Sequence, residues 1–182
     1  GGKGGGGGGE GPLGGSSWHL DGMDRGQYSP FSLLIGVALS DHSEEFSGNL
    51  CVHPGSHHTL KHFVRQYADV CDAADAADAA GAETGAGAGA EGAMQRRLAA
   101  VAALRASKPM LEEPVQVCMS AGDVVFAMHK VAHLGGPNYS PELRRMVYFR
   151  VSHQHLAQVK RRAMEDLWVE YEGMQEVLDM MK

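Results

Sequence analysis

The sequence has little cysteine, no long apolar run and no excess of positive charge. Its 182 residues include only three cysteines, Cys51, Cys71 and Cys118, without a CxxC pair. An odd number of widely spaced cysteines argues against a disulfide framework and indicates reduced, mostly buried thiols. No apolar run approaches the roughly 20 residues that a transmembrane helix needs. The formal net charge of -6 argues against nucleic acid or an anionic membrane as the main partner, because both require a basic surface.

The length and the first residues bound the organisation of the chain. A chain of 182 residues fits one domain with a sizeable core. The first residue is glycine rather than methionine, so the localisation stays unknown, although reduced cysteines favour the cytoplasm. Residues 1–17 are mostly glycine, and we expect a disordered tail because they cannot bury apolar surface.

The most informative stretch is 122–150, where two apolar runs flank a turn. Residues 124–128 and 146–149 are short, β-branched and aromatic runs, which predicts two strands. The sequence Gly-Gly-Pro-Asn between them predicts a turn. The connection carries His133 and ends at Arg144, so both side chains can point into one pocket.

A histidine–aspartate pair near the start of the chain supplies further metal ligands. His19 and Asp21 are two residues apart, so in an extended segment both side chains project from the same face. With His133 they form two imidazoles and one carboxylate, the facial triad that binds non-haem Fe(II) and leaves positions open for a co-substrate and oxygen. The planar guanidinium of Arg144 can bind the distal carboxylate of a dicarboxylic co-substrate that chelates the iron.

Two of these residues have neighbours of the same type. His129, at the end of the preceding strand, is the alternative to His133. Arg145 is the alternative to Arg144, and only one of them can enter the pocket because adjacent strand residues face opposite sides. A further group of histidines predicts the polar start of a surface helix rather than a second metal site: His57, His58 and His62.

Three blocks occur in a distinctive order along the chain. They are Trp18-His19-Leu20-Asp21-Gly22, the run Gly-Asn-Leu-Cys-Val-His-Pro-Gly-Ser-His at 48–57, and 122–144 with its Gly-Gly-Pro-Asn turn. This order is much more specific than an HxD pair alone. In it the chain resembles the phytanoyl-CoA dioxygenase family of Fe(II)- and 2-oxoglutarate-dependent oxygenases. The interval from His133 to Arg144 matches the family pattern, which favours these residues over His129 and Arg145.

The resemblance implies a mainly β fold, a double-stranded β-helix of the jelly-roll or cupin-like type with flanking α-helices. It also implies that the N-terminal elements of this fold are missing, because little sequence precedes His19. The implied iron ligands are His19, Asp21 and His133, and Arg144 is implied to bind 2-oxoglutarate. The implied reaction is hydroxylation of a small organic substrate by molecular oxygen, coupled to decarboxylation of 2-oxoglutarate to succinate and CO2.

The remaining sequence predicts how the chain is divided. We expect the core at 18–154, with a low-complexity insertion at about 71–94, and a C-terminal amphipathic helix at 155–182 that packs on the core. The Gly-Ala alternation at 81–92 is expected to be disordered. The other expected elements are a strand at 31–39 that is buried on both faces, strands at 48–53 and 114–119, and helices at 59–70 and 95–107.

Two other functions compete with the oxygenase. An inactive or truncated relative would act as a binding or scaffold module. Val37 and Gly135 favour it, because some family members have a tryptophan and a hydroxyl residue at these places. The other competitor is a cupin-type metal protein of different chemistry, although cupins lack the late arginine.

Overall fold

The computed structural model describes residues 18–84 and 90–181. The predicted tail at 1–17 and part of the predicted disordered segment, 85–89, lie outside the described residues. Within them the elements are, in chain order, β1 (Met23–Asp24), β2 (Gln27–Tyr28), β3 (Leu33–Ala38), β4 (Leu50–Val52), α1 (Ser56–Thr59), α2 (Lys61–Thr84), α3 (Ala90–Ala106), β5 (Val115–Val117), β6 (Val124–Ala127), β7 (His133–Gly135), β8 (Met146–Val151), α4 (Leu156–Glu165) and α5 (Met174–Met180).

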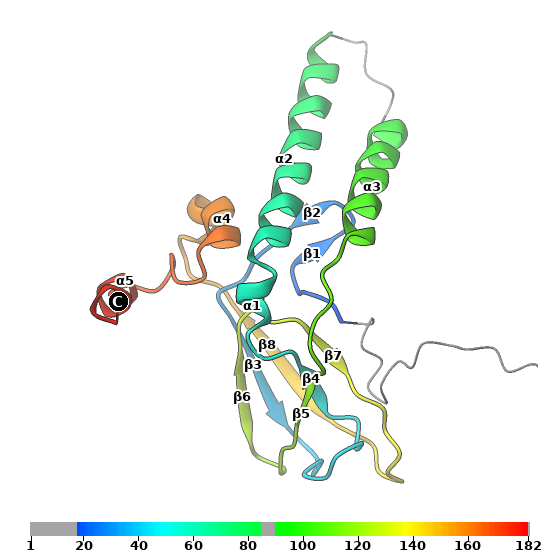
Figure 1. Cartoon of the computed structure of the whole chain (residues 1–182), viewed down its shortest axis with the longest axis vertical. Coiled ribbons are helices and arrows are strands. Elements are labelled where there is room, and N and C mark those ends of the chain that lie inside the picture. The colour runs from blue at the N-terminus through cyan, green and yellow to red at the C-terminus, as the bar shows by residue number, and fades with distance from the viewer. Residues whose placement is uncertain (1–17, 85–89, 182) are drawn as a thin grey trace, which may run out of the picture.

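The strands form three antiparallel sheets. Two of them have three strands, in the orders β6-β3-β8 and β5-β4-β7, and the hairpin β1-β2 forms the third (Figure 1). The sequence-predicted strands are all present, with slightly different bounds, and each three-stranded sheet joins strands from distant parts of the chain. Antiparallel sheets with several helices agree with the expected β-rich core. A complete double-stranded β-helix stays a prediction.

Strand β3 has two different faces. Leu34 lines a cavity together with Ala127 of β6, so one face of the sheet β6-β3-β8 points inward. Ile35 lies opposite Phe126 and Phe149, which are 65% and 53% exposed, so the other face is apolar and open. The prediction that this strand is buried on both faces is therefore wrong, because in the described residues no element covers the outer face.

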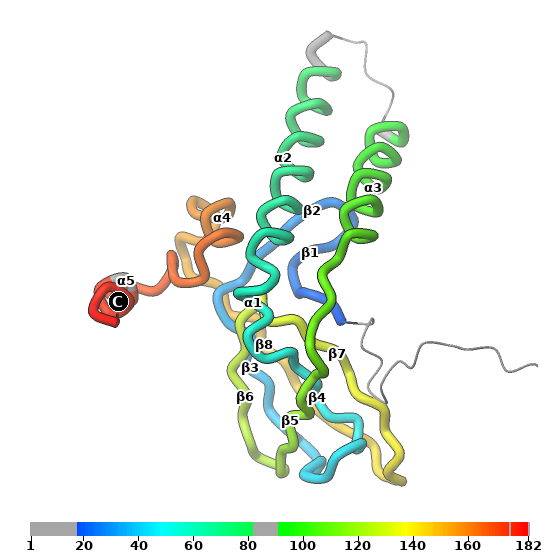
Figure 2. Tube along the Cα trace, in the orientation of Figure 1, coloured from blue at the N-terminus to red at the C-terminus, as the bar shows by residue number. Residues whose placement is uncertain are grey.

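Helices α2 and α3 form a long hairpin that extends away from the sheets (Figures 1 and 2). The prediction of a helix ending at residue 70 is wrong, since α2 runs without a break to Thr84. The prediction of disorder is also wrong for residues 81–84 and 90–92, which are helical. Alanine has the highest helix propensity, so an alanine-rich segment forms a helix once a partner holds it in place.

The aspartates of the low-complexity segment have partners. Asp75 and Asp78, three residues apart and hence on one face of α2, both bind the Arg97 guanidinium of α3, at 2.6 and 2.9 Å. Asp72, one turn earlier, accepts the Tyr28 hydroxyl hydrogen bond at 2.7 Å and pairs with Arg161 of α4 at 3.0 Å. The regular spacing of these aspartates therefore encodes the contacts of α2 with α3, α4 and the β1-β2 hairpin.

The core lies where the first half of α2 meets the sheets. Leu60, Tyr67 and Ala68 have no exposed surface, and they pack in one cluster with Trp18 and Leu134. Burying a large apolar side chain contributes about 1.5–3 kcal/mol, so this cluster anchors the base of the hairpin. All three cysteines are free, and Cys51 and Cys71 are buried, in agreement with the prediction of reduced thiols.

The C-terminal segment forms two helices rather than the single helix predicted for 155–182. Helix α4 ends at Glu165, and α5 begins after Gly173, whose φ of 77° favours glycine. Helix α4 packs on α2 and buries Ala163 and Met164. None of the helices in the described parts of the chain has the length and apolarity required to cross a bilayer.

Candidate metal centre

The segment that carries His19 and Asp21 is bonded to the edge strand β7. The backbone N–H of His19 donates to the carbonyl of His133 at 2.9 Å, and the N–H of His133 donates to the carbonyl of His19 at 3.1 Å. This pair of hydrogen bonds is an antiparallel bridge, which places the two histidine side chains beside each other. Asp21 follows two residues later and projects toward them, as the alternation of an extended segment predicts.

The chain turns directly after Asp21. Gly22 has a φ of +75°, and its carbonyl accepts a hydrogen bond from the N–H of Ser29 at 2.7 Å. A Cβ atom at this position would lie 2.4 Å from the carbonyl oxygen of Ser29. Only glycine fits this turn, which fixes the position of the Asp21 carboxylate.

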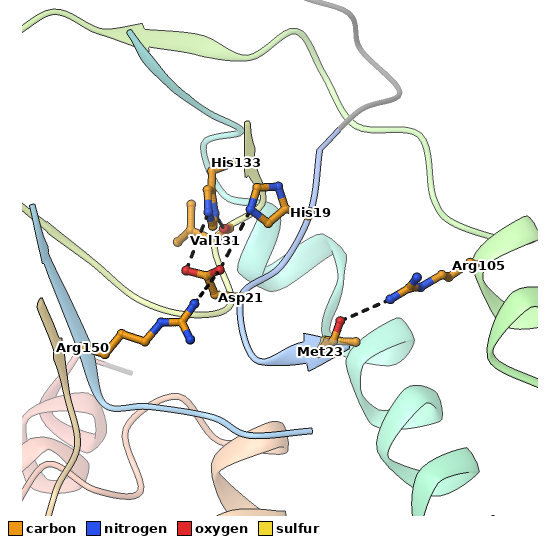
Figure 3. Close-up of polar contacts among 7 residues, drawn as sticks. All are labelled: His19, Asp21, Met23, Arg105, Val131, His133 and Arg150. Carbon is orange, nitrogen blue, oxygen red and sulfur yellow. Dashed lines mark hydrogen bonds and ion pairs between the residues drawn. The ribbon is translucent and has the colours of Figure 1, made fainter. Parts of the chain in front are cut away.

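The three side chains converge (Figure 3). His19 Nε2 lies 4.0 Å from Asp21 Oδ1, and His133 Nε2 lies 3.9 Å from Asp21 Oδ2. One potential ligand atom from each residue lies within 4.8 Å of the other two. Among the described residues, 18–84 and 90–181, this is the only such group of histidine, cysteine or acidic side chains.

The arrangement fits a divalent metal ion. Ligand atoms that bind one ion at ~2.1 Å lie roughly 3 Å apart, so these side chains need to approach by about 1 Å. Atom Nδ1 of His133 lies 2.9 Å from the carbonyl of Val131, to which it donates when it is protonated. This tautomer leaves the lone pair of Nε2 facing Asp21, as a metal ligand requires.

The local charges also bear on metal binding. Partial burial and the neighbouring His133 lower the pKa of His19 against the opposing charge of Asp21, so the neutral form that binds metals is favoured. Asp21 is largely buried, with 17% of its side chain exposed, and its Oδ1 atom pairs with Arg150 at 3.4 Å (Figure 3). Arg150 therefore supplies positive charge to Asp21 from the side opposite His133.

A cavity of about 420 Å³ adjoins Asp21 and His133 and is lined by side chains of both three-stranded sheets. Asp21 and His133 lie on its wall, and Arg144, two residues before β8, lines it as well. The Arg144 guanidinium donates to the hydroxyl of Tyr148 at 2.6 Å and to the sulfur of Met146 at 2.7 Å, and its Nε is buried without a hydrogen-bond partner. Its described acceptors are thus uncharged, which leaves the guanidinium able to bind an anion in the cavity.

The structure separates the sequence-predicted residues from their neighbours. Arg145 is exposed while Arg144 faces the cavity, as strand alternation predicts. His129 is buried against Phe31, with ring centroids 5.7 Å apart, and it does not belong to the group formed by His19, Asp21 and His133. Burial lowers the pKa of His129 to about 4. The predicted histidine group at 57–62 opens helices α1 and α2, as expected.

Sequence reasoning missed Tyr148 and Arg150. Both line the cavity, and both lie on β8, two and four residues after Met146 and therefore on the same face of the strand. The signal was available, because every second residue after Arg144 shares its face of the strand. Val37, in contrast, is an odd number of residues from the cavity-lining Leu34 and therefore lies on the other face of β3. Its identity does not alter the cavity. Gly135 does line the cavity.

Two histidines and a carboxylate beside a cavity between antiparallel sheets define a candidate mononuclear metal centre of the facial-triad type. The family model for phytanoyl-CoA dioxygenase matches residues 9–146, and the chain belongs to this family. The match includes His19, Asp21, His133 and Arg144 and ends before Arg150. No curated protein and no solved structure matches the chain. Family membership indicates an oxygenase dependent on iron and 2-oxoglutarate in general terms.

Proposed function

We propose that the chain is an Fe(II)- and 2-oxoglutarate-dependent dioxygenase that hydroxylates a small organic substrate. The observation that carries the proposal is the position of His19, Asp21 and His133 beside a cavity that also contains Arg144. Bound iron and 2-oxoglutarate would supply the oxidation: one oxygen atom of O2 enters the substrate and the other enters succinate, with release of CO2.

The protein residues would bind and orient these groups. His19, Asp21 and His133 would hold the iron on one face, and Arg144 would bind the distal carboxylate of 2-oxoglutarate through two parallel hydrogen bonds. The hydroxyl of Tyr148 lies 2.6 Å from the Arg144 guanidinium and would hold it in position. Apolar side chains on the cavity wall, including Leu34 and Leu50, would exclude water from the bound co-substrate.

Anaerobic titration with Fe(II) and 2-oxoglutarate tests the proposal, because a chelate of the two has a weak visible absorption band. We expect the band in the wild-type protein, its loss in His133→Ala and its weakening in Arg144→Ala. The matched controls are His62→Ala and Arg145→Ala, which remove an exposed histidine and an exposed arginine. Absence of the band in folded wild-type protein would contradict the proposal.

The second candidate is a binding module that has the fold without the catalysis. The ion pair between Arg150 and Asp21 favours it, because the guanidinium can balance the carboxylate without a metal ion. In that case Mn(II) would not compete with Fe(II), because neither ion would bind. Substitution of Arg150 would destabilise the fold, because it leaves the partly buried Asp21 without this partner.

A further inference from the structure

A second pocket lies beside His19, which is not among the residues that line the cavity with Arg144. It has a volume of about 230 Å³, and His19, which belongs to the candidate metal centre, forms part of its wall. The side chain of His19 is 58% exposed, so a molecule in this pocket can contact it. We call this the outer pocket, and the cavity that contains Arg144 the inner pocket.

Aromatic side chains form the floor of the outer pocket. Phe63 and Tyr67 are one helical turn apart on α2 and are 7% and 0% exposed, and Trp18 packs edge-on against Phe63 with ring centroids 6.5 Å apart. The Tyr67 hydroxyl accepts a hydrogen bond from the N–H of Gly26 at 3.2 Å, which ties α2 to the β1-β2 hairpin. The floor is therefore rigid and apolar.

Two cations from the end of α3 complete the pocket. Arg105 lies in the last turn of α3 and donates to the carbonyl of Met23 at 3.2 Å (Figure 3). Lys108 follows the helix, donates to the carbonyl of Trp18 at 2.5 Å and lies over the Trp18 ring at 3.3 Å from its centroid. Both cations thus use only neutral acceptors and an aromatic ring in the part of the chain that the structure describes.

The cations at the other contacts of this hairpin are paired differently. Arg97, two turns before Arg105 on α3, binds two aspartates, and Arg161, which packs on α2 from α4, binds Asp69 and Asp72. Those arginines join helices to one another. Arg105 and Lys108 face a cavity instead. The pKa of Lys108 is lowered mainly by burial and further by the positive charge of Arg105. An anion between them would relieve this repulsion.

We propose that the outer pocket is a substrate subsite for an organic anion, a molecule with an apolar or aromatic body and a phosphate or carboxylate group. Arg105 and Lys108 bind the anionic group, and the aromatic floor binds the body. The term substrate rests on the proposed function, whereas anion binding in this pocket does not require iron.

The fluorescence of Trp18 can report this binding. The variant Trp168→Phe retains Trp18 as its remaining tryptophan. Phenyl phosphate and benzoate are titrated into this variant without metal, and the fluorescence of Trp18 is measured. We expect a saturable change for at least one of these anions and none for benzyl alcohol. Lys108→Met and Arg105→Met are each expected to weaken the affinity about tenfold. The matched control Arg96→Met, an exposed arginine on the same helix, is expected to leave it unchanged.

The outcomes separate this proposal from the proposed function. An unsaturable response, equal binding of benzyl alcohol, or equal weakening by Arg96→Met overturns the anion subsite whatever the result with iron. In protein loaded with Fe(II) and 2-oxoglutarate, we expect the bound anion to shift the visible absorption band in wild type and not in Lys108→Met. Anion binding that leaves an existing band unchanged overturns the role of the pocket as a substrate subsite.

Discussion

The segment that carries His19 and Asp21 contributes to both pockets, because Asp21 lines the inner pocket and His19 lines the outer pocket, and each pocket contains two cations in a different environment. In the inner pocket, Arg144 has a buried Nε atom and donates to neutral groups between two sheets. In the outer pocket, Arg105 is exposed at the end of a helix. A charge interacts more strongly with an anion where water is excluded. The inner pocket is thus suited to bind an anion tightly, and the outer pocket to bind one more weakly.

The largest effect is expected from Arg144→Ala. It removes two charge-assisted hydrogen bonds to the co-substrate, worth about 3 kcal/mol together, so the affinity for 2-oxoglutarate should fall roughly 100-fold. Calorimetric titration of the Mn(II)-loaded protein with 2-oxoglutarate measures this. The control Arg145→Ala should change the affinity little, because Arg145 is exposed. Similar losses in both variants would mean that Arg144 does not bind the co-substrate.

Gly22→Ala should disturb both pockets, because Gly22 follows the segment that separates them. The new Cβ meets the Ser29 carbonyl oxygen at 2.4 Å, and φ is +75°. We expect a loss of about 3 kcal/mol in the free energy of unfolding, measured by urea denaturation, with weaker Mn(II) binding. Gly55→Ala is the matched control: its φ is +72° but its Cβ meets nothing within 4 Å, so about 1 kcal/mol should be lost. Equal losses would show that the clash with Ser29 is relieved by a backbone shift.

The inner pocket was largely predictable from the sequence, and the outer pocket was not. His19 and Asp21 are two residues apart, and the interval from His133 to Arg144 is fixed by a turn and the start of a strand. Within each segment these are local relations, which a sequence displays directly. The choice of His133 over His129, and its pairing with the distant His19, came from the family resemblance. The same alternation would have added Tyr148 and Arg150 if it had been extended along β8.

The outer pocket depends on contacts between distant residues. The Ala-Asp repeat of α2 has low complexity, and its helical state follows from partners such as Arg97, which lies 22 residues after Asp75. Lys108 reaches Trp18 across 90 residues of sequence. Helix propensity cannot show such a contact, because it describes only the local preference of the backbone. The prediction of a single C-terminal helix was wrong because apolar residues recur at helical spacing across the break before Gly173, so the local pattern does not show the break.

A pH experiment probes His129, which packs against Phe31 in the wall of the inner pocket. Burial lowers the pKa of His129 from 6.5 to about 4, so the unfolded state binds more protons than the folded state between these values. The contribution of His129 to the free energy of unfolding should therefore be fully present above pH 6.5 and fall as the pH drops toward 4. The loss from this residue amounts to at most about 3 kcal/mol. His129→Gln should reduce this pH dependence in urea denaturation curves. His62→Gln, which changes an exposed histidine, should leave it as in wild type, and a wild-type slope in His129→Gln would show that other groups cause it.

The smallest effect is expected from Arg150→Gln. Arg150 pairs with Asp21 at 3.4 Å, but 62% of its side chain is exposed, so the pair is worth at most about 1 kcal/mol. Because a metal ion and the guanidinium compete for the same carboxylate, removing the charge should raise the Mn(II) affinity, by roughly two- to fivefold, as measured by electron paramagnetic resonance. Arg145→Gln, with the same charge change away from Asp21, should have less effect. A lower Mn(II) affinity in Arg150→Gln would mean that Arg150 holds Asp21 in the position that binds metal, and the ion pair would then be part of the metal centre and not its competitor.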